Sequence, residues 1–323
     1  MAVIVFVKKD NSLEMAQEQP QIIDQIRELS RHSSDFYQEL EMRSRFVDTY
    51  QDISYPGSAV QLHSHTFYEL LYCRSANGVE YLVGSDRYKL QNGDLIFVAP
   101  GISHCPILPQ NMPGPYIRDV LWISEDFFQN ASADFGLSIE DSKETKLLRT
   151  AGTRWSHLSD LFHRGVVEAQ ERKYGWELAV AANTLTILTQ LLRANQDVHS
   201  RPLQAEKPEL LDQVMAYVER HLGERITLAD VARHFFISES TITQTFRKKM
   251  GISFYRCVTQ RRLIAAKGMI EKGIPMESVA EQVGFSDYSS FFRAFKQEYG
   301  VSPRQYRQKQ TTTAENKTSP DGQ

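Results

Sequence analysis

The 323-residue sequence contains only three cysteines, Cys73, Cys105 and Cys257. They lie far apart and form no CxxC pair, and an odd number of isolated cysteines argues against both a disulfide framework and a zinc knuckle. This usage fits a reducing compartment. A chain of this length can bury large apolar cores, so we expect two or three compact domains that fold without cross-links.

Long hydrophobic runs are also lacking. The most apolar long stretch, residues 176–192, contains a glutamate, two amides and three threonines, so it is too polar and too short to span a bilayer. The apolar segment 1–7 has no basic flank before it, and we interpret it as a short strand instead of a signal sequence. The sequence therefore predicts a cytoplasmic protein without a membrane partner.

Charge is nearly balanced overall, with a formal net charge of −3, but it is unevenly distributed. Residues 206–309 hold 17 Lys and Arg against 12 Asp and Glu, a formal charge of +5, whereas the rest of the chain carries −8. A basic block attracts phosphate, and an acidic block does not. This asymmetry favours a C-terminal module that binds nucleic acid and an N-terminal module with another role.

Residues 46–123 consist of short runs rich in Val, Ile, Tyr and Phe, interrupted by turn sequences such as Asn92-Gly93 and Pro100-Gly101. Repeated strands and tight turns predict a small β-barrel or sandwich. Helical periodicity is visible at 21–42, 156–170 and 174–193. One side of the last segment is apolar, which predicts either a dimer contact or packing against the protein's own barrel; it comprises Leu178, Ala181, Ala182, Leu185, Leu188, Leu191 and Leu192.

The expected fold class is α+β, and the expected boundaries follow these changes in texture. Residues 197–207 combine a proline, mixed charge and no periodicity, which is typical of a linker, and the polar C-terminal end predicts a disordered tail. The predicted units are a partly helical arm (1–45), a β-barrel (46–130), a helical dimerisation segment (131–196), the linker (197–207), a DNA-binding domain (208–309) and the tail (310–323).

The strongest signal is an internal repeat in the C-terminal block. Identical or similar residues recur 48 positions later in the first part of the repeat. After a one-residue insertion in the second copy, they recur 49 positions later. The pairs at 48 are Ile226 and Ile274, Val231 and Val279, Ala232 and Ala280; those at 49 include Ser240 and Ser289, Phe246 and Phe295, Gly251 and Gly300, Ser253 and Ser302.

Each copy has the pattern of a helix, a short turn and a second helix. In the first copy Thr227 and Asp230 have capping-box spacing, and Gly251 ends the second helix. In the second copy Gly284 falls at the turn, where glycine adopts positive φ without strain. A helix-turn-helix pair suits DNA because its second helix fits the major groove while the first braces it.

The outward positions of the two second helices carry groups that hydrogen-bond to base edges or phosphates. The candidate base-reading residues are Ser240, Thr241, Thr243, Gln244, Arg247, Ser289, Ser290 and Arg293. The candidate phosphate-binding residues are Lys248, Lys249 and Lys296, and the pair Arg261 and Arg262 also fits phosphate neutralisation. The alternative is a helical repeat or partner-binding bundle, whose outward Ser, Thr and Arg would be ordinary solvated surface.

These segments resemble the AraC/XylS family of bacterial regulators over about a third of the chain. The resemblance lies in ITLADVA (226–232), FRKKMG (246–251), RRLIAAK (261–267), VAEQVGFSDYSSFFRAFK (279–296) and GVSPRQYR (300–307). The sequence departs from the family at Phe235 and Phe236, where smaller or polar residues are common. The resemblance implies a DNA-binding transcription regulator that partners double-stranded DNA, RNA polymerase and a second copy of itself.

The β-rich region resembles the two cupin motifs at His63, His65 and Glu69, followed by His104. The resemblance implies that these four residues bind a small-molecule effector or hold a divalent ion, since three imidazoles and a carboxylate suit Fe, Mn, Ni or Zn. The alternative is a set of polar barrel residues that hydrogen-bond each other. Several aromatic residues could stack on an effector or belong to the core: Phe67, Tyr68, Tyr72, Tyr81 and Tyr88.

We therefore expect an effector-controlled transcription regulator that is not an enzyme and needs no cofactor, with a carbohydrate as one candidate effector and a metal as the alternative. The rival hypothesis is a metal-dependent cupin oxygenase or isomerase. A tandem DNA-reading block has no use in such an enzyme, which favours the regulator.

Overall fold

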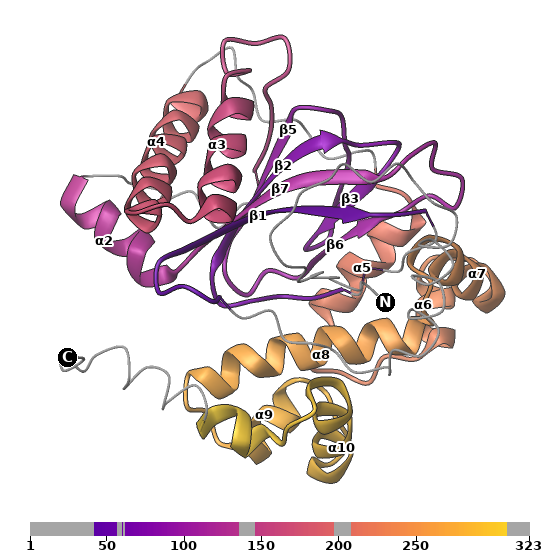
Figure 1. Ribbon diagram of the computed structural model, residues 1–323. Coiled ribbons are helices and arrows are strands. Elements are labelled where there is room, and N and C mark those ends of the chain that lie inside the picture. Colours follow the sequence, from indigo (N-terminus) through magenta and orange to yellow (C-terminus); the bar gives the residue numbers. More distant parts are fainter. Residues whose placement is uncertain (1–41, 57–59, 61, 136–145, 197–207, 309–323) are drawn as a thin grey trace, which may run out of the picture.

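Two β-sheets form the N-terminal half of the computed structural model (Figure 1), which describes residues 42–56, 60, 62–135, 146–196 and 208–308. A five-stranded antiparallel sheet has the order β1-β7-β2-β5-β8, and a three-stranded sheet has the order β4-β3-β6. The strands are β1 (Val47–Ser54), β2 (Tyr68–Ser75), β3 (Glu80–Val83), β4 (Asp86–Lys89), β5 (Asp94–Val98), β6 (His104–Ile107), β7 (Tyr116–Ile123) and β8 (Lys146–Arg149).

The central strand β2 is buried on both faces, which explains its nearly continuous apolar sequence. Leu70 and Tyr72 pack into a cluster with the helices outside the sheet. Leu71 and Cys73 point the other way, into the layer shared with the three-stranded sheet. Side-chain alternation along a strand therefore gives the N-terminal half two apolar layers, one on each side of the large sheet.

Of the two expected arrangements, barrel or sandwich, the strands of the described residues form the sandwich, and the barrel is not closed. Within the described residues, strand pairing leaves two separate sheets, and only an isolated bridge between His63 and His104 extends the smaller one. Strand β3 pairs with β4 along one edge and with β6 along the other, so neither edge can pair with a strand of the large sheet. The sheets instead face each other across a shared apolar core.

Three helices accompany the large sheet: α2 (Glu125–Phe135), α3 (Leu158–Glu171) and α4 (Trp176–Gln196). The predicted helices at 156–170 and 174–193 correspond to α3 and α4, which cover the outer face of the sheet (Figure 1). The buried face of α4 differs from the predicted stripe, because Leu178 is 75% exposed whereas Asn183 and Thr184 are buried. Asn183 donates to the Leu161 carbonyl and Thr184 to the Val180 carbonyl, which satisfies their polar groups inside the contact.

The C-terminal half is entirely helical in its described part. Two short-helix pairs flank the long helix α8, which lies below the sheets in Figure 1. The helices are α5 (Leu210–Arg220), α6 (Leu228–His234), α7 (Glu239–Met250), α8 (Phe254–Glu271), α9 (Met276–Gln282) and α10 (Tyr288–Tyr299).

Helix caps appear at equivalent places in the two pairs. The side chains of Ser238 and Asp287 each accept a hydrogen bond from the backbone N–H three residues later, and so begin α7 and α10. Gly251 and Gly300 end these helices in the left-handed conformation. The caps and the shared buried phenylalanine, Phe246 in one pair and Phe295 in the other, reproduce the sequence repeat in three dimensions.

Four predicted segments lie outside the described residues: the strand at 1–7, the helix at 21–42, the linker at 197–207 and the tail at 310–323. Among the described residues, no helix is both long and apolar enough to cross a membrane.

The two turns of the repeat carry different residues at the position of positive φ. Gly284 takes φ +83° in the turn between α9 and α10, and a Cβ there would lie 2.4 Å from the Leu222 carbonyl oxygen. The equivalent position of the first turn holds Phe236 at φ 56°, with its side chain 95% exposed. A non-glycine residue in this region is strained by about 1–2 kcal/mol, and an exposed ring gains little packing in return.

These two positions should therefore respond oppositely to substitution. We expect Phe236→Gly to raise the free energy of unfolding by about 1 kcal/mol, because strain is relieved at almost no packing cost. We expect Gly284→Ala to lower it by more than about 1 kcal/mol, since strain and the clash with Leu222 add together. Urea denaturation of both variants measures the changes, and a loss of stability in Phe236→Gly would contradict the assignment of strain.

Candidate nucleic-acid interface and histidine cluster

The outer face of α7 carries most of the predicted base-reading side chains of the first pair. Ser240, Thr241, Gln244 and Arg247 are exposed. Thr243 is half-buried, and its hydroxyl donates to the Glu239 carbonyl. Because Ile242 and Phe246 are fully buried on the opposite side, this polar face is turned outward by the amphipathic pattern of α7 itself.

The outer face of α10 also carries predicted base-reading side chains, but fewer of them. Ser289 and Arg293 are exposed. Ser290 takes part in the cap, because its hydroxyl donates to Asp287 and accepts from Arg293. The ring of Phe291 anchors the opposite side of the helix in the core. Both second helices thus present hydrogen-bonding groups away from their cores, as an element that enters a DNA groove requires.

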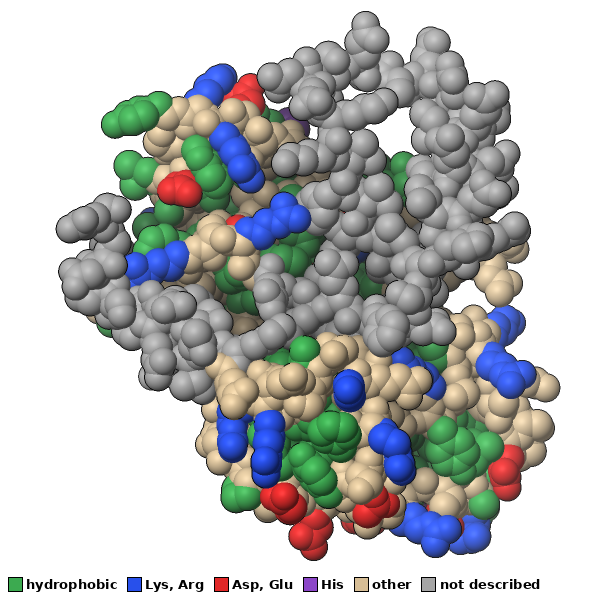
Figure 2. All heavy atoms as spheres, turned by 60° about the horizontal axis from the view of Figure 1, so that its bottom comes forward, with side chains coloured by type: hydrophobic (Ala, Val, Ile, Leu, Met, Phe, Trp, Pro, Cys, Tyr) green, Lys and Arg blue, Asp and Glu red, His purple; other side chains and the backbone are tan. Residues whose placement is uncertain are grey.

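The predicted phosphate-binding lysines lie in two different settings. Lys248 and Lys296 are exposed. Lys249 is partly buried, with its Nζ 2.5 Å from Glu209 Oε2. Figure 2 turns the C-terminal end of the molecule forward and shows Lys and Arg side chains spread over it between hydrophobic patches.

Neither arginine of the Arg261 and Arg262 pair is presented to a phosphate in this arrangement. The Arg261 side chain is 1% exposed and reaches the N-terminal sheets. Arg262 donates to the carbonyls of Leu222 and Glu224, and so ties α8 to the loop after α5. Both side chains hold structural elements together, so the phosphate role expected for them does not fit this structure.

A second polar cluster lies buried between the two sheets. His104 Nε2 is 2.9 Å and His65 Nε2 is 3.5 Å from Glu69 Oε2, and all three residues are buried. Their potential ligand atoms lie within 4.8 Å of one another. His63 lies beside them, with its ring centroid 4.3 Å from that of His104, but it is not one of these three converging residues.

The tautomers of the two buried imidazoles follow from their other ring nitrogens. His65 Nδ1 lies 2.8 Å from the Phe67 carbonyl and His104 Nδ1 lies 2.9 Å from the Ile102 carbonyl. A carbonyl only accepts, so Nδ1 carries the proton in each ring. In a neutral ring Nε2 then holds a lone pair directed at Glu69, and only a proton or a cation can bridge these groups.

Electrostatics in the cluster depend on the protonation of the two rings. Burial alone would raise the pKa of the Glu69 carboxyl, but hydrogen bonds from the protonated rings of His104 and His65, together with their charge, outweigh burial and hold that pKa well below its usual value. Burial lowers the pKa of His65 and so favours its neutral ring, although Glu69 partly opposes this shift. The cluster can therefore hold a shared proton, or a divalent cation on two Nε2 atoms and a carboxylate.

The C-terminal part of the chain matches a known protein family. Residues 231–309 match the family described as "Helix-turn-helix domain". This part of the chain is an AraC-type helix-turn-helix domain. The match spans the end of α6 through α10, so it includes both of the outward faces described above.

The relatives of the AraC-type domain are regulators by name. The chain is 38% identical over 104 residues to the probable transcriptional regulator LumQ of Photobacterium leiognathi, an alignment that covers 31% of this chain and 42% of LumQ. It is 26% identical over 255 residues to the transcriptional activator RhaS of Salmonella dublin, which covers 78% of this chain and 89% of RhaS. The chain thus spans less than half of the length of LumQ but most of RhaS.

Among solved structures, the C-terminal domain of the response regulator AraT from Geobacillus stearothermophilus is 31% identical in sequence. The likeness covers 29% of this chain and 79% of that domain, with a TM-score of 0.29.

Two contributors to these sites were missed from sequence. Trp122 Nε1 donates to Glu69 Oε1 at 2.7 Å and fixes the carboxylate from the neighbouring strand. Arg87 binds carboxylates at the start of α5, the first helix of the C-terminal half. Neither residue stands in a motif. Strand register brings Trp122 to Glu69, and the packing of α5 against the three-stranded sheet brings Arg87 to its carboxylates. The aromatic residues Phe67, Tyr72, Tyr81 and Tyr88 are buried in the apolar cores.

The histidine cluster should make the fold sensitive to acid. Glu69 stabilises the folded state above its ordinary pKa of 4.5, and this contribution is lost as the pH falls through the lowered folded value. His65 acts in the same direction below its ordinary pKa of 6.5, because the unfolded chain takes up the proton more readily. Denaturant unfolding between pH 7 and 3 should show a smaller loss of stability for Glu69→Gln than for the unsubstituted protein. Equal losses would contradict the assignment.

Proposed function

We propose that this protein is a sequence-specific DNA-binding transcription regulator of the AraC type, controlled by a small-molecule effector bound near the histidine cluster. The observation that carries the proposal is the duplicated helix-turn-helix unit, in which α7 and α10 turn equivalent polar faces away from separate cores. The similarity to LumQ and RhaS supports it.

The spacing of the two units suits one face of a duplex. Helix α8 has 18 residues and is therefore about 27 Å long, close to the roughly 34 Å between successive major-groove segments. Its first half packs against the first unit and its second half against the second. We infer that α7 and α10 enter neighbouring segments, so that one subunit reads a long site.

Individual side chains should divide into two classes. Arg293→Ala and Gln244→Ala should each weaken binding to the cognate site by about 1–3 kcal/mol and relax sequence preference, since they remove contacts to base edges. Lys248→Ala should weaken binding to all sequences similarly and reduce the salt slope by about one, because it removes a phosphate contact. Titrations on cognate and mixed-sequence duplexes at several salt concentrations separate these classes. Equal losses on both duplexes for Arg293→Ala would refute base reading.

The effector site is supported by the cluster of His65, Glu69 and His104. In neutral rings its converging lone pairs need a cationic or proton-donating partner, so a divalent metal fits, and so does a ligand whose hydroxyl or ammonium group donates to them. A carbohydrate is one such ligand, with hydroxyls that donate. When bound, a metal would supply a positive charge for an oxygen ligand.

Metal binding can be tested with the ions themselves. We expect Mn²⁺ or Zn²⁺ added to metal-free protein to change the fluorescence of Trp122, whose indole N–H holds Glu69, and His104→Ala to weaken this response by at least about tenfold. His163→Ala is the matched control, since His163 is exposed on α3. An equal response in His104→Ala would contradict a metal at this cluster and leave the organic effector as the candidate.

Two partner predictions complete the proposal. A regulator of this kind is expected to contact RNA polymerase and to form a homodimer. The exposed side of α4, with Leu178 75% exposed, is the candidate dimer contact.

A further inference from the structure

The three-stranded sheet has two faces with different neighbours. Tyr81 and Val83 on β3 point into the core between the sheets. Their alternates on the same sheet, Leu82 on β3 and Cys105 on β6, belong to an apolar cluster with helices α5, α7 and α8. Figure 1 shows α5 between this sheet and the other helices of the C-terminal half. The sheet therefore separates the histidine cluster on one side from the first helix-turn-helix unit on the other.

The first ionic contact across this boundary is centred on Arg87, whose side chain is 3% exposed. It is 2.8 Å from Glu80 on the neighbouring strand, and 3.1 Å from both Glu209 and Asp212 at the start of α5. One guanidinium thus pairs with a carboxylate of the sheet and two of the helical domain. Without Arg87 the buried carboxylate of Asp212 would lose its cationic partner.

The second ionic contact is centred on Arg261 in the middle of α8. Its guanidinium donates to the hydroxyl of Ser103 and, at 2.6 Å, to the carbonyl of Gly84. It is also 2.5 Å from Glu219 on α5. Ser103 directly precedes His104 in the sequence, so the segment that enters β6 contacts the DNA-binding domain and the histidine cluster with adjacent residues.

The contact reaches the basic end of α7. Lys249 Nζ lies 3.7 Å from Glu80 of the sheet as well as 2.5 Å from Glu209. DNA affinity depends on free positive charge near phosphates. A sheet carboxylate beside Lys249, on an acidic N-terminal half, lowers the positive potential at this end of the helix.

Two features of the boundary favour opening. A buried ion pair is worth little net stability, because desolvation offsets most of the attraction. A solvent-open pocket of about 380 Å³ lies beside Arg87, lined also by Asp86, Asp212, Arg220 and Phe235 among others, so solvent reaches this edge of the contact. Both features favour a small free-energy difference between the closed contact and an opened one.

We propose that Arg87 and Arg261 form a reversible latch that docks the first helix-turn-helix unit on the three-stranded sheet, and that this docked state opposes DNA binding. The inference rests on the proposed function. Release of the latch moves Glu80 away from Lys249 and separates the acidic half from the duplex. The ionic contacts of the latch join the sheet to the start of α5, the end of α7 and the middle of α8, so the latch acts on the first unit.

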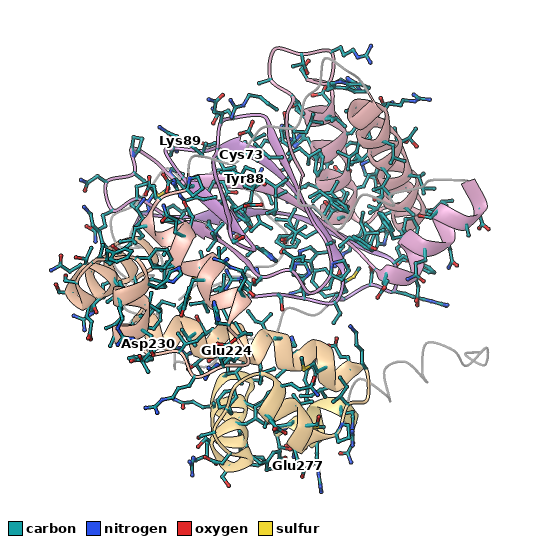
Figure 3. The ribbon with its side chains drawn as sticks, turned by 180° about the vertical axis from the view of Figure 1, so that it is seen from behind. Cys73, Tyr88, Lys89, Glu224, Asp230 and Glu277 are labelled. Atoms are coloured by element: carbon teal, nitrogen blue, oxygen red, sulfur yellow. The ribbon has the colours of Figure 1, made fainter. Side chains whose placement is uncertain are left out.

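The full-length protein contains its own reporter of docking. Cys105 is buried in the interface cluster, whereas Cys73 is buried between the two sheets; the latter is labelled in Figure 3 within the strands, away from the helical domain. Site-resolved thiol labelling therefore measures opening at Cys105, with Cys73 as the internal control. Binding to a mixed-sequence genomic duplex, measured at several salt concentrations, gives the second readout.

The principal variant is Arg87→Met, which removes the charge and keeps most of the side-chain volume. We expect labelling of Cys105 to rise about tenfold with Cys73 unchanged, and affinity for the duplex to rise about tenfold, within the usual range of coupling between two sites. Arg87→Lys should restore most of the wild-type behaviour. Arg149→Met is the matched control, because Arg149 pairs with Asp94 inside the N-terminal sheets and should change neither readout.

Ser103→Ala is a milder second variant, which removes only one hydroxyl from the Arg261 contact and so keeps the test valid if Arg87→Met does not fold. Faster Cys105 labelling without a gain in affinity would overturn the inhibitory role, and unchanged labelling in both variants would overturn the latch. Absence of salt-dependent DNA binding by every variant, with Cys105 labelling still increased, would instead refute the proposed function and the inhibition together.

Discussion

Helix α8 is the element on which the DNA-binding half depends. Its N-terminal residues Phe254, Cys257 and Val258 complete the core of the first helix-turn-helix unit. Leu263, Ala266 and Ile270 complete the core of the second. Neither unit encloses an apolar core alone, so α8 sets both their stability and the distance between α7 and α10. The same helix carries Arg261 to the sheets, and the position of the first unit is therefore linked to the N-terminal half.

The three-stranded sheet has a comparable role on the other side of the boundary. Because successive side chains of a strand alternate, β6 directs His104 toward Glu69 and Cys105 toward the helices. A strand is stiff along its length, so a ligand that displaces His104 would shift its neighbours Ser103 and Cys105. This arrangement offers a short physical route from the candidate effector site to the DNA-binding domain.

Sequence reasoning succeeded where the determinants are local. The cap at Thr227, the helix end at Gly251 and the buried positions of the repeat each depend on residues within one turn of chain. The positions of α3, α4 and the helices of the repeat followed from the same short-range patterns, whereas α2 and α5 were not predicted. The convergence of His65, Glu69 and His104 was suggested by the cupin resemblance, and the structure brings these three together.

Other features could not be predicted because they depend on long-range pairing. The sheets remain separate since β3 uses both edges on its neighbours, a choice that no local pattern encodes. Arg87 and Asp212 are 125 positions apart, and Arg261 and Ser103 are 158 apart, so the reassignment of Arg261 from phosphate to interface required the tertiary structure. The buried face of α4 was misplaced because Asn183 and Thr184 satisfy their polar groups within the packed helices.

The central claim is that one chain places two recognition helices in neighbouring grooves of one duplex face. Hydroxyl-radical and guanine-methylation footprinting on a genomic site selected by the purified protein tests it most directly. We predict two protected major-groove segments about one helical turn, or roughly 10 base pairs, apart on the same face for each bound subunit. Protection of a single segment per subunit, or of segments on opposite faces, would contradict the claim.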